Sequence, residues 1–158
     1  MIARVYADGA CIGNPGPGGF AAVVLVDGSE PRWLTGADPQ TTNNQMELTA
    51  AIRGLEEARA LGPDEILVYS DSKYLIRGIT EWIGAWRRNG WLTSGKQPVK
   101  NRDLWMRLDA LTADGKVAWR YVRGHAGNKY NEQCDRRAKE MAWQVARRRV
   151  PERRTPER

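Results

Sequence analysis

The sequence predicts an α/β domain in which a mixed sheet is flanked by helices. Two observations predict it. Three strand-like segments follow one another near the N-terminus, at residues 2–8, 20–26 and 32–35. From residue 42 onward, segments with a helical spacing of apolar residues alternate with strand-like segments. We expect a single domain over residues 1–146.

The first three strands are expected to form an antiparallel meander. Residues 2–8 place small apolar residues on alternate positions, which is typical of a strand. The glycine- and proline-rich stretch 13–19 cannot be helical. Residues 20–26 are continuously apolar and suit a buried strand, and the tight-turn signal Asp27-Gly28 then leads into the third strand.

The next element is a helix that begins near Thr42. Thr42 and Gln45 have the spacing of a capping box, and Leu61-Gly62-Pro63 ends the helical pattern. The remaining expected elements are a strand at 65–70, helices at 72–78, 80–88 and 102–111, a strand at 117–122, and a last helix at about 128–147.

The charge of the chain favours a polyanionic partner. The 158 residues carry a formal net charge of +6. Residues 147–158 contain six Arg and two Glu, a net +4, which leaves +2 for residues 1–146. We expect this Arg-rich tail to be a disordered, solvated end.

The two cysteines, Cys11 and Cys134, form no Cys-x-x-Cys pair, and a single histidine cannot complete a zinc site with them. Free thiols indicate a reducing compartment. Arg4 falls where a signal peptide would need apolar residues, and no apolar run has the length of a membrane span. We therefore expect a cytoplasmic protein with no membrane partner.

Two predicted strands end in an aspartate followed by a small residue, Asp8-Gly9 and Asp71-Ser72. If these strands are parallel neighbours, both carboxylates point into the same crevice beyond the strand ends. Their repulsion would raise their pKa values, and a divalent cation such as Mg²⁺ would relieve it. Each aspartate alone is also an ordinary turn or cap residue, so a structural role stays open at this point.

Two further acidic residues cannot be singled out by spacing. Glu47 lies early in the helix that begins near Thr42, where acidic residues are common. Asp135 adjoins the apolar stripe of the last helix, and it could simply pair with Arg136 or Lys139.

A set of motifs then runs through the chain: DGACIGNPGPGG at 8–19, TTNNQMEL at 41–48, YSDS at 69–72, PVKNRDLW at 98–105 and GHAGN at 124–128. Together they resemble bacterial type 1 ribonuclease H, the ribonuclease HI family, over about residues 2–142. Such a set is far more specific than one short motif.

The resemblance implies the ribonuclease H-like fold, a five-stranded mixed sheet with three antiparallel strands followed by two parallel ones. It implies an endonuclease that hydrolyses the RNA strand of RNA–DNA hybrids and leaves 5′-phosphate and 3′-hydroxyl ends. Two Mg²⁺ ions, for which Mn²⁺ can substitute, would clamp the attacking water and the leaving oxygen. A monomer that binds the hybrid duplex is expected.

The family's metal-binding carboxylates fall on Asp8, Glu47, Asp71 and Asp135, with Asp8 bridging both ions. These four, with the family's mobile histidine at His125, form the expected catalytic set. His125 would assist proton transfer or product release.

The resemblance also implies nucleic-acid contacts. Hybrid-recognising asparagines fall on Asn14, Asn43 and Asn44, whose amides can meet base edges or a ribose hydroxyl. Groups near Cys11 would help to recognise the 2′-hydroxyl, and Asn14 and Thr42 match a pocket for a DNA-strand phosphate. Turn and cap roles stay open for these two residues.

One position departs from the family pattern. Lys73 stands where many relatives have glutamine, and a lysine there suggests a phosphate contact.

A basic segment, residues 87–102, contains no acidic residue and is interleaved with tryptophans. The family carries a basic protrusion there that grips the DNA strand. The expected contacts are Trp82, Arg87, Arg88, Lys96 and Lys100. The alternative is a solvated loop above core tryptophans.

Other functions fit less well. Gln97 follows Gly95-Lys96 where a phosphate-binding loop needs Ser or Thr, so ATP use is not indicated. A hybrid-binding module without catalysis, and a DNA resolvase or transposase on the same fold, remain alternatives that a cleavage assay distinguishes.

Overall fold

The computed structural model describes residues 1–124 and 128–154, with side chains described as far as residue 148. Five strands form one mixed sheet in the order β3-β2-β1-β4-β5. β1 pairs antiparallel with β2 and β2 with β3, whereas β1–β4 and β4–β5 are parallel. The strands are β1 (Ile2–Cys11), β2 (Gly16–Val26), β3 (Arg32–Thr41), β4 (Glu65–Ser70) and β5 (Val117–Tyr121). The predicted fold class is confirmed.

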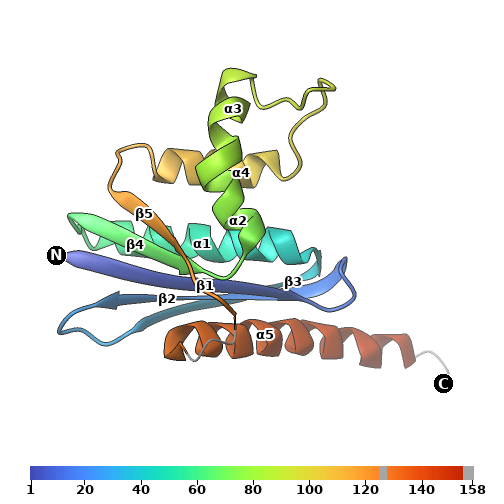
Figure 1. Cartoon of the computed structure of the whole chain (residues 1–158). Coiled ribbons are helices and arrows are strands. Elements are labelled where there is room, and N and C mark those ends of the chain that lie inside the picture. The colour runs from blue at the N-terminus through green and yellow to red at the C-terminus, as the bar shows by residue number, and fades with distance from the viewer. Residues whose placement is uncertain (125–127, 155–158) are drawn as a thin grey trace.

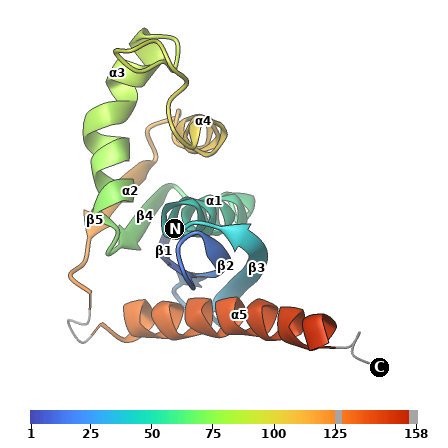
Figure 2. The same cartoon turned by 90° about the vertical axis from the view of Figure 1, so that its right-hand side faces the viewer.

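Helices cover both faces of the sheet (Figures 1 and 2). They are α1 (Asn43–Ala60), α2 (Lys73–Arg77), the short π-helix η1 (Gly78–Trp82), α3 (Ile83–Arg88), α4 (Arg102–Leu111) and α5 (Lys129–Arg154). α1 lies on one face, α2 lies beside β4 and β5 on the same side, and α3 and α4 are farther from the sheet, whereas α5 lies on the other face. None of the helices in the described part of the chain is long and apolar enough to cross a bilayer.

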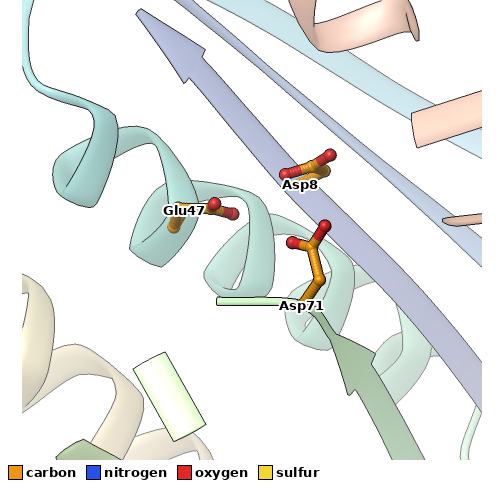
Figure 3. Close-up of side chains that lie close together, drawn as sticks. All are labelled: Asp8, Glu47 and Asp71. Atoms are coloured by element: carbon orange, nitrogen blue, oxygen red, sulfur yellow. The ribbon is translucent and has the colours of Figure 1, made fainter. Parts of the chain in front are cut away.

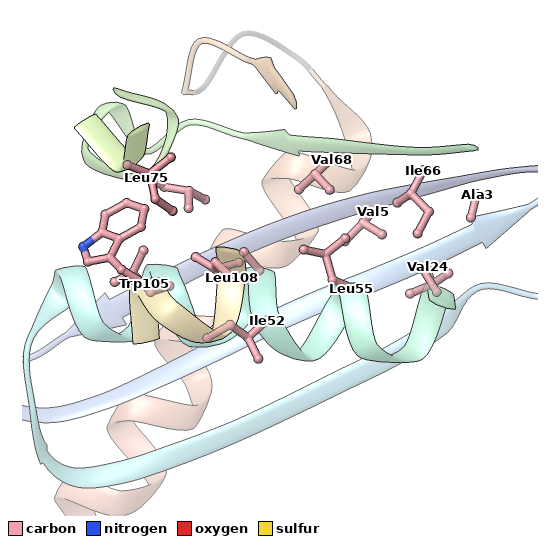
Figure 4. Close-up of a cluster of buried hydrophobic side chains, with 14 of the residues drawn as sticks. Ala3, Val5, Val24, Ile52, Leu55, Ile66, Val68, Leu75, Trp105 and Leu108 are labelled. Carbon is pink, nitrogen blue, oxygen red and sulfur yellow. The ribbon is translucent and has the colours of Figure 1, made fainter. Parts of the chain in front are cut away.

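The core follows from the alternation of side chains along the strands. Ala3, Val5 and Val24 face α1 and form the main core with residues of α1, α2 and α4, as Figure 4 shows. Ala21 and Val23 point to the opposite face, where α5 packs through Cys134 and Ala138 among others. A strand that is buried on both faces must be apolar at every position, which explains the unbroken apolar run of β2.

Glycine permits two close approaches that position the site. A Cβ on Gly9 would lie 2.5 Å from the backbone N of Glu47, so α1 can approach β1 only at a glycine. A Cβ on Gly19 would lie 2.4 Å from the carbonyl O of Ala138, so the same argument applies to α5 and β2. A larger residue at position 9 would push α1 away from β1, which carries Asp8, and one at position 19 would push α5 away from β2.

The last helix is longer than expected. It was expected to end near residue 147, but α5 continues to Arg154. Arg and Glu in this stretch are good helix formers, whereas Pro151 lies within it and cannot donate a backbone hydrogen bond to the helix. Residues 155–158 lie outside the described residues.

One of the two hydrogen bonds of the predicted capping box is present at the start of α1. The backbone N–H of Gln45 donates to Thr42 Oγ1 at 3.1 Å, as a helix cap requires. The side chain of Gln45 does not close the box, because its amide contacts Thr41 and Asn101. The helix is therefore capped by Thr42, and Gln45 is used elsewhere.

Candidate active site

Three carboxylates far apart in the sequence meet beside β1, at the point where β4 ends. The strand that was predicted to end at Asp8 continues to Cys11, so Asp8 lies within β1. β1 and β4 are parallel neighbours, which places Asp8 of β1 beside Asp71, the residue after β4. α1 packs on β1 and brings Glu47 to the same point (Figure 3). Each of the three residues offers one oxygen that lies within 4.8 Å of the others.

The site is buried, and its charges repel one another. Asp8 is 3% exposed and Glu47 is 6% exposed. The backbone N–H of Gly9 donates to Asp8 Oδ1 at 2.8 Å and to Glu47 Oε1 at 2.9 Å, which orients both carboxylates. Burial, together with the charges of Asp71 and Asp135, raises the pKa of Asp8 to about 7. Burial and the charge of Asp8 also raise the pKa of Glu47 well above its ordinary value.

These observations fit a divalent cation site. Asp8 Oδ2 is buried and has no hydrogen-bond partner among the described residues. A buried polar atom without a partner is costly, and so is a set of adjacent carboxylates. Hard oxygen ligands of this kind suit Mg²⁺ or Mn²⁺. A bound cation would satisfy the orphan oxygen and offset the repulsion at the same time.

Asp135 lies at the edge of this cluster and has a second partner. It lines the same hollow as the other three carboxylates, and its charge contributes to the raised pKa of Asp8. Asp135 Oδ2 also forms an ion pair with Lys139 Nζ at 3.1 Å, and the Asp135 side chain is 29% exposed. The site role and the pairing with Lys139 were considered as alternatives from the sequence, and the structure allows both.

The carboxylate hollow is the depression lined by these residues and their neighbours from β1, α1 and α5. Its lining consists of Asp8, Gly9, Ala10, Cys11, Ile12, Asn43, Glu47, Asp71, Asp135, Lys139, Ala142 and Trp143. Two predicted substrate contacts, Cys11 and Asn43, are thus next to the carboxylates. The Cys11 thiol donates to the carbonyl oxygens of Gly16 and Thr41, and burial raises its pKa.

Trp143 was not singled out from the sequence. A signal was available, because Trp143 falls outside the apolar stripe that packs α5 against the sheet.

Asn14 and Thr42 hold the start of α1. Asn14 Oδ1 accepts the backbone N–H of Asn43 at 2.8 Å, and Thr42 is the cap described above. Their turn and cap roles are therefore present. Asn44 is half-buried in the first turn of α1, and Lys73 is exposed at the first position of α2.

His125 lies outside the described residues. The residue before it is described, and it approaches the site: a Cβ on Gly124 would lie 3.0 Å from Asp71 Oδ2. The chain therefore passes next to the carboxylates immediately before His125.

The tryptophans near the basic segment pack against one another with tilted rings. Ring contacts join Tyr74, Trp82, Trp86, Trp91 and Trp105, with centroid separations of 5.3–6.3 Å. Trp105 is fully buried, so the expectation that some of these tryptophans belong to the core is confirmed. Trp82 is half-buried within this aromatic cluster.

The cations of the basic segment point outward. Arg88, Lys96 and Lys100 are exposed. Arg87 is also exposed but forms an ion pair with Asp109 at 2.9 Å, so part of its charge is already compensated.

A chain of hydrogen bonds joins the aromatic cluster to the start of α1. Thr41 Oγ1 donates to Gln45 Oε1 at 2.7 Å, and Gln45 Nε2 donates to Asn101 Oδ1 at 3.2 Å. Asn101 Nδ2 and Trp105 Nε1 then both donate to the hydroxyl oxygen of Tyr74, at 3.1 and 3.0 Å. This connection was not foreseen from the sequence, because Gln45 and Asn101 are 56 residues apart.

Comparison with known proteins agrees with this architecture. The sequence pattern of the family described as RNase H matches residues 2–143. The chain belongs to the ribonuclease H family. It is 54% identical over 131 residues to the Ribonuclease H of Marinobacter nauticus, covering 83% of this chain and 87% of that protein. It is 50% identical over 139 residues to the Ribonuclease H of Shewanella amazonensis, covering 88% and 87%.

A solved ribonuclease H structure shares the fold. It is the crystal structure of LC9-RNase H1, described as a type 1 RNase H with the type 2 active-site motif. The two chains are 32% identical and superpose with a TM-score of 0.78, covering 91% of this chain and 73% of that one. An acidic carboxylate cluster of the kind seen here is typical of a ribonuclease H metal site.

Proposed function

We propose that the chain is an endonuclease that hydrolyses the RNA strand of RNA–DNA hybrids at the carboxylate hollow. Two Mg²⁺ ions, replaceable by Mn²⁺, would be held by Asp8, Glu47, Asp71 and Asp135. The products would carry 5′-phosphate and 3′-hydroxyl ends. The observation that carries the proposal is the buried, mutually repelling group of carboxylates with an unsatisfied Asp8 oxygen, in a chain that belongs to the ribonuclease H family.

The protein's own groups prepare this site. The Gly9 N–H fixes one oxygen each of Asp8 and Glu47, and it leaves Asp8 Oδ2 without a hydrogen-bond partner among the described residues. Asp8 interacts electrostatically with Asp71 and Asp135 and shares the Gly9 contact with Glu47, so it is placed to be the shared ligand. When bound, the ions would supply an activated water and charge stabilisation at the leaving oxygen.

A proton carrier would complete the chemistry. His125 follows Gly124, which lies next to Asp71. We assign it to proton transfer or product release, between two flanking glycines that permit movement. His125→Ala should slow turnover by roughly 10²–10⁴-fold, and a loss as complete as that of a carboxylate variant would assign it a different role.

The surfaces around the hollow suit a hybrid duplex. Asn43 and Cys11 line the hollow itself, where they could meet the ribose hydroxyls of the RNA. Asn14, Thr42 and Asn44 surround the N-terminus of α1, whose backbone N–H groups favour a phosphate.

The DNA strand would be held away from the carboxylate hollow. Lys73 at the start of α2 and the exposed Arg88, Lys96 and Lys100 would contact its phosphates, with Arg87 and Trp82 as weaker contributors. We further propose that the protein works as a monomer.

A direct test compares four labelled substrates: RNA–DNA hybrid, double-stranded RNA, double-stranded DNA and single-stranded RNA. We expect cleavage of the hybrid RNA strand with Mg²⁺ and none with EDTA. Binding of the hybrid without cleavage in Mg²⁺ or Mn²⁺ would identify a non-catalytic module. Preferred cleavage of double-stranded DNA would identify a resolvase or transposase.

A further inference from the structure

Trp143 is exposed beside the carboxylate hollow. All seven tryptophans lie in the described part of the chain, and Trp143 is the one that is exposed, with 51% of its surface open. The packed side of α5 is formed by Cys134, Ala138 and Ala142, so the position of Trp143 is not required by the core. A large aromatic side chain left in water beside a functional hollow indicates a contact surface.

A second hollow continues the first along α5. Asp135, Lys139 and Trp143 line both, and the second extends over Arg136, Glu140, Gln144 and Arg147. Steps of four residues keep these side chains on one side of the helix. The distance along the axis from Asp135 to Arg147 is about 18 Å, which corresponds to about five nucleotides at the spacing of about 3.4 Å between stacked bases.

The charge of this surface becomes positive away from the carboxylates. Lys139 is paired with Asp135, so these two charges offset each other. No acidic residue occurs from Met141 to Pro151, and Arg147 and Arg148 are exposed. An exposed aromatic ring between cations is the combination that binds single-stranded nucleic acid.

The position of the surface identifies the strand. It is continuous with the carboxylate hollow, where the proposed function places the RNA strand. The basic segment lies beyond the opposite face of the sheet from α5 (Figures 1 and 2) and is separated from this surface. A strand that leaves the carboxylates along α5 is therefore the RNA strand.

We propose that Lys139, Trp143 and Arg147, the α5 stripe, bind a single-stranded RNA segment that extends beyond the hybrid. Trp143 stacks on an unpaired base, because the bases of a duplex are already stacked on their neighbours. Arg147 contacts a phosphate of the same segment. The proposal rests on the proposed function only in placing RNA at the carboxylates. It adds a preference for sites where RNA leaves a hybrid.

The test measures binding in EDTA, so that it does not depend on cleavage. Four ligands are compared by fluorescence anisotropy: a blunt hybrid, the hybrid with about six unpaired RNA nucleotides at the 5′ or the 3′ end, and the hybrid with a DNA extension of equal length. We expect one of the RNA extensions to tighten binding at least about fivefold, and the DNA extension to do less.

Trp143→Ala should remove the tighter binding that the RNA extension gives, and Trp143→Phe should keep most of it, because an aromatic ring remains. Arg147→Ala should reduce it and lower the salt dependence of extended-hybrid binding by about 0.7 in the log–log slope. Met106→Ala is the matched control, because Met106 is exposed to a similar degree on α4. The circular dichroism of the Met106→Ala variant and its binding to all four ligands should match those of the unmodified protein.

Two outcomes overturn the proposal. If Trp143→Ala weakens the blunt and the extended hybrids equally, Trp143 contacts the duplex. If neither extension tightens binding, the α5 stripe is a solvated helix face. Neither result bears on hybrid cleavage, which is measured separately with Mg²⁺.

Discussion

The carboxylate hollow and the aromatic cluster are built on opposite principles. In the hollow, like charges are buried together, an oxygen of Asp8 has no hydrogen-bond partner among the described residues, and the pKa of Asp8 is raised to about 7. In the aromatic cluster, Trp105 is fully buried and its N–H is satisfied by the Tyr74 hydroxyl oxygen. The first region stores unfavourable electrostatic energy, and the second stabilises the fold.

The difference shows how the two regions divide the work. Repulsion in the hollow can be relieved only by a ligand, so that region is prepared for binding and chemistry at a cost in stability. In the aromatic cluster the Trp105 N–H and the Tyr74 hydroxyl are paired, and the cations lie outside, so charge is displayed on a packed base. Substitutions should therefore lower activity in the hollow and lower stability in the aromatic cluster.

The largest expected effect is on activity in the hollow. Asp8→Asn removes the charge of the central carboxylate, and we expect turnover of a hybrid to fall by at least about 10³-fold, with hybrid binding changed only a few-fold. Single-turnover cleavage and anisotropy measure the two quantities. Asp27→Asn, in an exposed turn, is the control. Near-normal turnover in Asp8→Asn would remove Asp8 from the catalytic set.

The largest expected effect on stability is in the aromatic cluster. Trp105→Ala leaves a cavity in the main core and should lower the free energy of unfolding by about 3–5 kcal/mol. Denaturant unfolding measures this change, with Met106→Ala on the same helix as an exposed control. Activity per folded molecule should be retained. A loss below about 1 kcal/mol would show that the cluster does not carry the stability assigned to it.

In the carboxylate hollow, a substitution should raise the free energy of unfolding when no metal is present, whereas Trp105→Ala lowers it. Because the pKa of Asp8 in the folded chain is raised from 3.8 to about 7, the folded chain binds the proton more tightly than the unfolded chain. Stability should therefore fall as pH rises from about 4 to about 7. Asp8→Asn cannot ionise, so its free energy of unfolding should exceed that of the unmodified protein by roughly 1–3 kcal/mol above pH 7.

Unfolding in EDTA at several pH values measures this difference, which should vanish near pH 4. Added Mg²⁺ should stabilise the unmodified protein more than Asp8→Asn. A difference that stays constant with pH would show that ionisation of Asp8 is not the source of the strain.

The smallest expected effect concerns the cations outside the aromatic cluster. Replacing Arg88, Lys96 and Lys100 by Ala should reduce the slope of log K against log salt by about 0.7–0.9 for each lost phosphate contact. Stability should change by less than about 0.5 kcal/mol, since the three residues are exposed. Lys116→Ala is the control, because Lys116 is exposed in the connection between α4 and β5, outside the basic segment. An unchanged slope would place the DNA-strand contacts elsewhere.

Local patterns in the sequence were enough to predict the element order and one half of the site. Alternation and helical spacing depend on near neighbours, so β1, α1 and β4 could be placed within a few residues. Asp8 and Asp71 could be paired because both were predicted at the ends of strands, although β1 in fact continues past Asp8 to Cys11. Glu47, Asp135 and His125 were identified only through the family motifs, since their spacing carries no signal of its own.

Contacts between distant elements were decided by the tertiary structure. Gln45 has the spacing of a capping residue, yet its amide bonds Asn101 of a segment 56 residues away. Trp143 is exposed beside the carboxylates because Gly19 lets α5 pack closely on β2 through the opposite side of the helix. The sequence states which side chains are available, but the packing of helices on the sheet determines which of them share a surface, because that depends on atoms from segments far apart in the chain.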